Sequence, residues 1–292
     1  MIGCRHGPQA PRVAGLSKLV TIEEAARAVP DGCRVAFGGG GALMRRPLAF
    51  TRELIRREAR DLDVFQFLGG IEIDLLIAAG AVRSTNCAYV GLLELGQSPC
   101  FQRAVAAGEI EVNEYSEFSF MAALKAADMD LPFIPWKTPW GSDIVRSLGL
   151  RTVRDPYSEQ ELLALRAIRL DCAVIQVERA DEDGFVELPA APDLIWDYDY
   201  LIGRVAERTI VCAEEIGPPR DPARVAMVGR EVTHVVEAPR GAWPTGLSPL
   251  YEPDVDHVLG TFMPAAEAGG EALDAYLEAA VEAGPGGGGG GG

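Results

Sequence analysis

The feature that most constrains the fold is a short apolar run that ends in four consecutive glycines. A strand is expected at residues 34–37, and Gly38, Gly39, Gly40 and Gly41 follow it directly. Glycine has no Cβ atom, so the backbone can adopt unusual angles and approach a ligand closely. A glycine-rich turn between a strand and a helix is typical of a ligand-facing loop. The alternative is a tight strand-to-helix turn that binds nothing.

The residues after the glycines favour a helix and carry positive charge. Pro47 suits the first turn of a helix, and apolar residues recur at helical spacing over 47–60. Free N–H groups at such a turn favour an anion or a developing oxyanion, and Arg45 and Arg46 add charge beside it. The spacing matches neither the dinucleotide fingerprint nor the P-loop. We therefore expect the glycines, Arg45 and Arg46 to contact an anionic part of a substrate.

Apolar segments alternate with helical patterns along most of the chain. Strands are expected at residues 34–37, 62–68, 86–90, 110–112, 173–177, 209–213 and 234–237; helices are expected at 22–29, 47–60, 73–79, 100–107, 119–127 and, capped by Ser158, 159–167. Most of these strands are apolar throughout, which indicates burial on both faces. The order predicts an α/β fold with an open, mainly parallel sheet and helices on both faces.

Several of the expected strands end in glycines or carboxylates. Gly69 and Gly70 follow the second strand, and Glu117 lies just beyond the fourth. Ligands of parallel sheets gather at the carboxyl ends of the strands, so a carboxylate there is a candidate base or nucleophile. The alternative for Glu117 is an interface or capping carboxylate ahead of a helix. A buried strand is expected at 131–136, and Ser142 is placed in a loop beside the same edge.

Composition limits the partners and the compartment. The 292 residues suffice for one large domain, expected at 18–283, with a flexible extension at 1–17 and a disordered glycine tail at 284–292. A formal net charge of -16 argues against a nucleic-acid partner. No apolar run approaches the roughly 20 residues of a membrane span. The 6 cysteines are too scattered for a metal or redox motif, which favours a reduced, cytoplasmic chain.

Two acidic clusters do not support a metal site. Residues 197–199 and 254–257 lack any recognised ligand spacing, so we interpret both as solvated surface. No tightly bound cofactor or metal is expected.

The order of motifs resembles the A (alpha) subunit of the family I CoA-transferases, in the glutaconate CoA-transferase branch. The resembling motifs occupy residues 38–47, 79–83, 89–91, 114–118, 131–135, 141–144, 178–184, 213–216 and 235–245. They follow the family order across most of residues 18–280. The resemblance implies an open α/β fold shared with sugar-phosphate isomerases of the same superfamily.

The resemblance also implies an activity and a partner. Family members pair this subunit with a homologous B subunit, in a heterodimer or a heterotetramer, and move coenzyme A from an acyl-CoA to a carboxylic acid. The nucleophilic glutamate belongs to the B subunit, which implies that this chain supplies the glycine loop and the walls of the acyl and CoA sites. Residues given that role are Gly38, Gly39, Gly40, Gly41, Arg45, Arg46, Gly69, Gly70 and Ser142.

Two alternatives stay open at this point. A related group opens rings of steroid-derived CoA thioesters by hydrolysis. The resemblance of this chain to that group implies that the A subunit carries a catalytic glutamate at the position of Glu117. Phe118, however, stands where that group has a glycine. The other alternative is a non-catalytic subunit that binds an acyl-CoA or a sugar phosphate. The sequence leaves the acyl group and the stoichiometry open.

Overall fold

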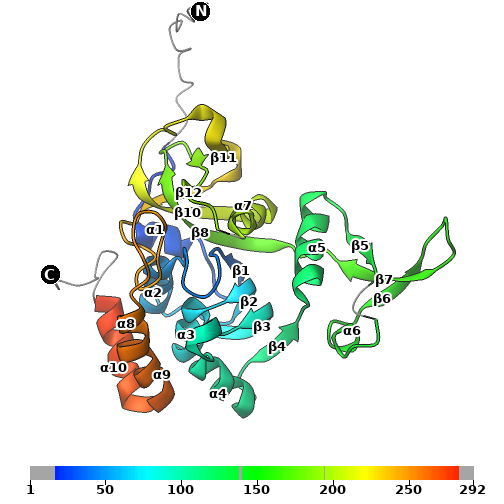
Figure 1. Cartoon of the computed structure of the whole chain (residues 1–292), viewed down its shortest axis with the longest axis horizontal. Helices are drawn as coiled ribbons and strands as arrows, with labels where there is room; N and C mark the ends of the chain where they lie inside the picture. The colour runs from blue at the N-terminus through cyan, green and yellow to red at the C-terminus, as the bar shows by residue number, and fades with distance from the viewer. Residues whose placement is uncertain (1–16, 138–139, 194, 283–292) are drawn as a thin grey trace, which may run out of the picture.

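The strand that precedes the glycines, β1 (Arg34–Phe37), lies in the middle of a parallel sheet. The computed structural model describes residues 17–137, 140–193 and 195–282. Parallel pairing gives the order β12 (His234–Glu237), β10 (Ala206–Ile216), β8 (Leu170–Ala180), β1, β2 (Leu62–Gly69), β3 (Val82–Val90) and β4 (Glu111–Glu114). This arrangement confirms the predicted fold class, and each strand expected for the sheet is present (Figure 1).

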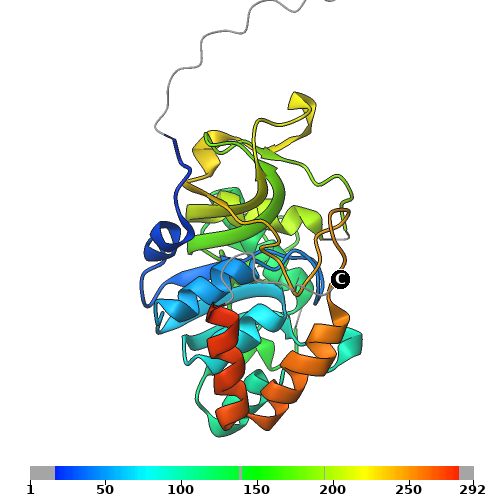
Figure 2. The same cartoon turned by 90° about the vertical axis from the view of Figure 1, so that its left-hand side faces the viewer.

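Helices cover both faces of this sheet, as predicted. Their bounds are α1 (Ile22–Arg27), α2 (Leu48–Arg56), α3 (Ile71–Ala78), α4 (Pro99–Ala107), α5 (Glu117–Asp128), α6 (Ile144–Ser147), α7 (Trp196–Val205), α8 (Val255–His257), α9 (Met263–Ala268) and α10 (Gly270–Glu282). One buried apolar cluster joins one face of the sheet to α1–α4, α9 and α10, and a second joins the opposite face to α5 and α7. In Figure 2, α9 and α10 lie on the outside of the helices that cover the first face.

Short elements extend the sheet. β9 (Val186–Glu187) pairs antiparallel with the end of β8, and β11 (Val225–Met227) pairs antiparallel with β9. The described part of the chain also contains three short 3-10 helices, η1 (Leu93–Leu95), η2 (Pro222–Arg224) and η3 (Gly229–Glu231), and one π-helical turn, η4 (Val258–Phe262). Residues 1–16 and 283–292, where the extension and the glycine tail are expected, lie outside the described residues.

A separate antiparallel sheet forms an arm that projects from the body (Figure 1). It contains β5 (Phe133–Trp136), β7 (Glu161–Arg166) and β6 (Arg151–Arg154), with α6 beside it. The expectation of a buried strand at 131–136 is therefore wrong in burial, since Phe133 is 37% exposed. β5 is an edge strand of the arm, so only one side of it is paired.

The helix expected at 159–167 is also wrong, because this segment is the central strand of the arm. Leu163 and Leu165 are buried while the residues between and beside them are more exposed, which is the period of a strand. Pairing with β5 and β6 on both sides overrides the helical propensity of the segment. Ser158 does not cap a helix; its hydroxyl donates to Asp155 over 2.5 Å.

Candidate active site

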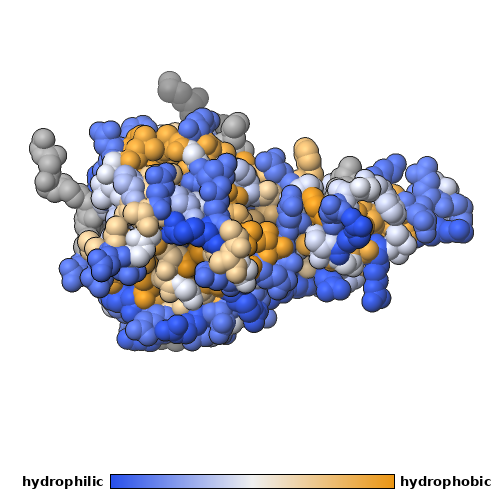
Figure 3. Space-filling view, turned by 90° about the horizontal axis from the view of Figure 1, so that it is seen from below, coloured by the Kyte–Doolittle hydropathy of each residue, from blue (hydrophilic) through white to orange (hydrophobic). Residues whose placement is uncertain are grey.

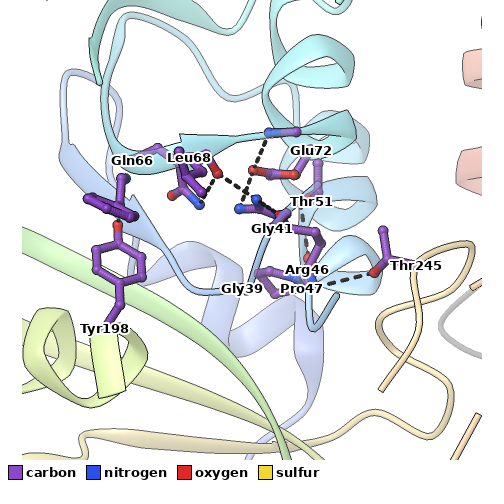
Figure 4. A network of polar contacts seen from close by, with 12 residues as sticks. Gly39, Gly41, Arg46, Pro47, Thr51, Gln66, Leu68, Glu72, Tyr198 and Thr245 are labelled. Carbon is purple, nitrogen blue, oxygen red and sulfur yellow. Dashed lines mark hydrogen bonds and ion pairs between the residues drawn. The ribbon is translucent and has the colours of Figure 1, made fainter. Parts of the chain in front are cut away.

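The carboxyl ends of β1 and β2 are tied together by one buried arginine (Figure 4). Arg46 is fully buried, and its Nη1 donates to Glu72 Oε1 on α3 over 3.0 Å. Its Nη2 donates to the carbonyl oxygen of Gly41 and, over 2.5 Å, to that of Leu68 at the end of β2. The Arg46 side chain therefore fixes the position of the glycine loop relative to the next strand.

Most N–H groups of the glycine loop are used inside the fold. Gly38 N–H donates to Val174 over 2.8 Å, Gly39 N–H donates to Asp199 Oδ1 over 2.8 Å, and Gly40 N–H donates to Met44 over 2.9 Å. The expectation that these groups are free is therefore wrong for Gly38, Gly39 and Gly40.

The next two N–H groups along the loop differ. Those of Gly41 and Ala42 donate to no acceptor within the described part of the chain. Gly41 has a φ of 62°, in the left-handed region that favours glycine. Adjacent backbone donors of this kind can stabilise a developing oxyanion.

Close packing explains why the loop needs glycine. A Cβ atom on Gly38 would lie 2.8 Å from the Asp199 carboxyl carbon, and one on Gly40 would lie 2.3 Å from Asp193 Oδ2. Gly39 has a φ of 125°, and a Cβ there would lie 2.6 Å from Arg46 Cδ. The loop thus packs directly against the side chains that hold it in place.

Arg45 holds the outer side of the same loop. It forms ion pairs with Asp193 and with Asp199, the latter over 3.4 Å between Nε and Oδ2. Asp199 is 2% exposed. The interpretation of residues 197–199 as solvated surface is therefore wrong for Tyr198 and Asp199, because α7 packs on the sheet and directs Asp199 at the glycine loop. Asp197 is exposed, as predicted. Tyr198 is also buried, and its hydroxyl accepts from Phe67 N–H over 3.3 Å.

A second loop, residues 238–251, packs against the start of α2. Arg45 N–H donates to Gly246 over 2.7 Å, and Arg46 N–H donates to Thr245 Oγ1 over 3.3 Å. Ala49 N–H, in the first turn of α2, donates to Gly241 over 2.8 Å. The N-terminus of α2 is thus capped within the protein, so the structure does not support it as an anion site.

That second loop is anchored by Glu214 at the end of β10. Its carboxylate accepts from Tyr251 Oη over 2.5 Å, from Gln176 Nε2 over 2.8 Å and from Arg240 N–H over 2.5 Å. Burial raises the pKa of Glu214, and these donors oppose the rise. Glu214 is therefore a positioning residue of the loop.

Glu72 is the most deeply buried carboxylate of the site. It lies in the first turn of α3, and it accepts from Gly70 N–H over 3.1 Å as well as from Arg46. Burial raises the pKa of Glu72, while the positive charge of Arg46 and the Gly70 N–H oppose the rise. Glu72 Oε2, Arg46 Nε and Gln66 Oε1 are buried without a hydrogen-bond partner among the described residues. Such a cluster of orphaned polar atoms is typical of a site for ordered water.

The structure brings Gly69 and Gly70 to the glycine loop but not Ser142. A Cβ on Gly70 would lie 2.9 Å from the Ala42 carbonyl oxygen, so the two backbones are in contact. Ser142 instead lines a hollow of about 330 Å³ with Val112 and Glu114 of the edge strand β4. Its predicted contact with substrate stays a prediction.

Glu117 begins α5 and is exposed. Ser116 caps this helix, with its hydroxyl accepting from Ser119 N–H over 3.2 Å. No hydrogen bond or ion pair joins the Glu117 side chain to another residue within 17–137, 140–193 and 195–282. A carboxylate at a helix N-terminus is stabilised by the helix dipole, and this one is free to meet a substrate or a partner. Phe118 beside it is 76% exposed.

Sequence reasoning missed three carboxylates that hold the loop. Glu72, Asp193 and Asp199 each contact a loop arginine or the loop backbone. A signal existed for Glu72 alone, because it lies in an apolar run directly after two glycines. In the part of the chain that is described, no group of three or more His, Cys, Asp or Glu side chains is placed to hold a metal ion. No helix there has both the length and the apolar content needed to cross a bilayer.

Comparisons with known proteins show the family of the chain. Residues 19–238 match the family model for coenzyme A transferase. The chain is 32% identical over 247 residues to the cholesterol ring-cleaving hydrolase IpdA subunit of Rhodococcus jostii, covering 79% of this chain and 81% of that protein. It is 29% identical over 265 residues to the A subunit of glutaconate CoA-transferase from Acidaminococcus fermentans, covering 82% and 80%. A protein of Archaeoglobus fulgidus is 35% identical over 248 residues, covering 82% of this chain, which spans only 54% of that protein's length.

Solved structures show the same fold. Glutaconate coenzyme A-transferase from Acidaminococcus fermentans matches with a TM-score of 0.82 and 26% identity, covering 90% of this chain and 88% of that one. A variant of the decarboxylase AibA/AibB matches with a TM-score of 0.78 and 30% identity, covering 90% and 100%. The matched residues contain the glycine loop, the arginines after it and the carboxylates that hold them, and the chain belongs to the coenzyme A transferase family.

Proposed function

We propose that this chain is the A subunit of an acyl-CoA:carboxylate CoA-transferase and shares its active site with a homologous B subunit. One observation carries the proposal: each described carboxylate that contacts the glycine loop already forms an ion pair with an arginine of the loop. Glu72 pairs with Arg46, Asp193 pairs with Arg45, and Asp199 binds both Arg45 and Gly39 N–H. Attack on a thioester by any of these carboxylates would draw it away from the arginine or N–H group that it holds, which favours a nucleophilic glutamate from another chain.

The chemistry proceeds in balanced steps. A glutamate carboxylate of the B subunit attacks the thioester carbonyl of an acyl-CoA and expels the CoA thiolate, which gives a mixed anhydride. The thiolate then attacks the glutamyl carbonyl and releases the first carboxylic acid. The reverse steps with a second acid complete the transfer. In the first tetrahedral intermediate, the N–H groups of Gly41 and Ala42 are the donors that this chain offers to the oxyanion.

The remaining candidate residues fall into two groups. Gly41, Gly69 and Gly70 present backbone to the site, whereas Arg45 and Arg46 act through the loop they hold. All five described cysteines, which are Cys33, Cys87, Cys100, Cys172 and Cys212, are free, in keeping with a reducing cytoplasm. The partner would complete a heterodimer or a heterotetramer.

The proposal is tested by measuring the transfer of CoA from an acyl-CoA to a second carboxylic acid. The full chain is co-purified with its partner from source cells and incubated with an acyl-CoA and a labelled carboxylic acid. Ping-pong transfer of CoA to the labelled acid is the expected result. Absence of exchange across a broad panel of acids, with the complex intact, contradicts the proposal.

Glu117 favours a second candidate, the A subunit of a ring-opening CoA-thioester hydrolase. Its carboxylate is exposed and makes no hydrogen bond or ion pair within the described ranges, and the ring-cleaving IpdA relative is at least as similar to this chain as the transferase relative is. In this candidate, Glu117 acts as the base that activates water. Consumption of a CoA thioester without transfer to any acid would favour it.

A further inference from the structure

A cleft of about 400 Å³ separates the body from the arm and lies away from the glycine loop. Residues from the beginnings of the parallel strands line its floor, among them Arg34 of β1, Asp63 of β2 and Ser84 of β3. β7 and the segment around α6 line the opposite wall. The glycine loop follows the other end of the same strands. The cleft is therefore distinct from the candidate active site. Figure 3 shows, from below, the arm extending beyond the body.

Two arginines in this cleft have no anionic partner among the described residues. Within the described ranges, neither the Arg34 guanidinium nor the Arg166 guanidinium forms an ion pair or a hydrogen bond. Arg34 lies 4.9 Å above the centre of the Phe65 ring, which holds its side chain by a cation–π contact. Because the chain has 43 acidic residues against 27 basic ones, two unpaired guanidinium groups in one cleft are a local exception to its charge.

The two arginines come from opposite walls of the cleft, and Tyr115 lines the same space. Burial raises the pKa of Tyr115, and the charges of Arg34 and Arg166 both oppose this rise. All three side chains belong to the lining of this one cleft. A third arginine of the cleft, Arg83, is already paired with Asp63.

We propose that this cleft binds a compact anion bearing a carboxylate or phosphate group, held between Arg34 and Arg166. Guanidinium groups bind these anions with charge-assisted hydrogen bonds. Polar side chains of the same lining, including Ser84, Asn86 and Asn113, can complete the shell. Since the anion would bridge the sheet and the arm, its binding would fix the arm relative to the body.

Titration calorimetry on the full chain tests this proposal. The probes are succinate, inorganic phosphate and adenosine 3′,5′-bisphosphate, each at low ionic strength. Saturable binding of succinate or phosphate with one site per chain is expected. Arg34→Gln and Arg166→Gln should each weaken it by about tenfold or more, as expected for the loss of one charge-assisted contact.

The matched control is Arg154→Gln, which removes an arm arginine that is already paired with Glu159 outside the cleft lining. Its affinity for the probes should equal that of the unaltered chain. Absence of saturable binding, or equal affinity in all three variants, overturns the proposal. Binding of the bisphosphate alone also overturns it, because the cleft would then belong to the nucleotide end of coenzyme A.

Discussion

The Arg46 guanidinium and the Glu72 carboxylate form an ion pair of 3.0 Å in which both side chains have 0% exposure. Removing one partner of such a pair leaves an uncompensated buried charge, at a cost of about 3–5 kcal/mol. Arg46→Met should therefore lower the free energy of unfolding by this amount at pH 8, measured by urea denaturation of the full chain.

The cost of Arg46→Met should also depend on pH. Burial alone raises the pKa of Glu72, and Arg46 opposes the rise. Without Arg46, Glu72 takes up a proton at higher pH and the buried charge disappears, so the loss of stability should be smaller at pH 5 than at pH 8. Arg154→Gln is the control, because its pair with Glu159 is exposed and contributes less than about 1 kcal/mol. Equal effects of the two substitutions would refute the structural role of Arg46.

Gly40→Ala should disrupt the glycine loop. The new Cβ atom would lie 2.3 Å from Asp193 Oδ2, so either the loop or the Arg45–Asp193 ion pair has to move. We expect at least a tenfold loss of thioester-dependent activity in the complex, because a displacement of about 1 Å can cost a hundredfold in rate. Gly260→Ala is the matched control, since a Cβ atom at that position would have no described neighbour within 4 Å. Full activity of Gly40→Ala would show that the loop does not position reacting groups.

The parallel sheet was predictable because its strands are continuous apolar runs separated by helical patterns. The helix expected at 22–29 is present as α1, and Thr21 and Glu24 form a capping box at its start. The arm was not predictable, because Leu162, Leu165 and Ile168 recur at a helical spacing, while Leu163 and Leu165 alternate as in a strand. Their strand depends on pairing with β5, which is distant in the sequence, as well as with β6, the preceding strand of a hairpin.

The candidate site was predictable only in part. Four glycines and two arginines mark the loop, but the sequence does not show which carboxylates reach it. Asp199 lies in a segment rich in aspartate and tyrosine that suggests exposed surface, and its burial follows from α7 packing on the sheet. The partner of each arginine is a tertiary contact across 26 residues for Glu72 and 154 residues for Asp199. Local patterns carry no information on such contacts.

Asp74 should make stability depend on pH. It is buried and accepts from the Cys100 and Phe101 N–H groups over 3.2 and 2.8 Å, which caps α4. Burial raises its pKa from 3.8 to about 6. A carboxyl whose pKa is raised by folding stabilises the folded state below its unfolded pKa, and this contribution is lost as the pH rises through about 6.

Urea denaturation from pH 4 to pH 7.5 measures this effect. Over this pH range, Asp74 should lower the free energy of unfolding of the full chain by on the order of 2–3 kcal/mol. The decrease should be smaller by this amount in Asp74→Asn, because its side chain stays neutral. Parallel pH profiles for the two proteins would show that Asp74 ionises in the fold as it does in the unfolded chain.

Glu117→Gln separates the two candidate activities. If the nucleophile belongs to the partner, the variant should retain CoA exchange within about threefold, because Glu117 bonds no described residue of the loop. If Glu117 is the base of a ring-opening hydrolase, the same change should slow the water-dependent consumption of the CoA thioester by about a hundredfold or more. Rates of exchange and of water-dependent consumption of the CoA thioester are measured on the same preparation, with Glu114→Gln as the neighbouring exposed control.

Intact-mass spectrometry tests most directly whether this chain holds the glycine loop while a partner supplies the nucleophile. The co-purified complex is incubated with an acyl-CoA, and both proteins are weighed and then mapped by peptide. We expect a covalent CoA adduct on a glutamate of the partner and none on this chain. An adduct on Glu117, or release of free acid and CoA with neither protein modified, would contradict this division of roles.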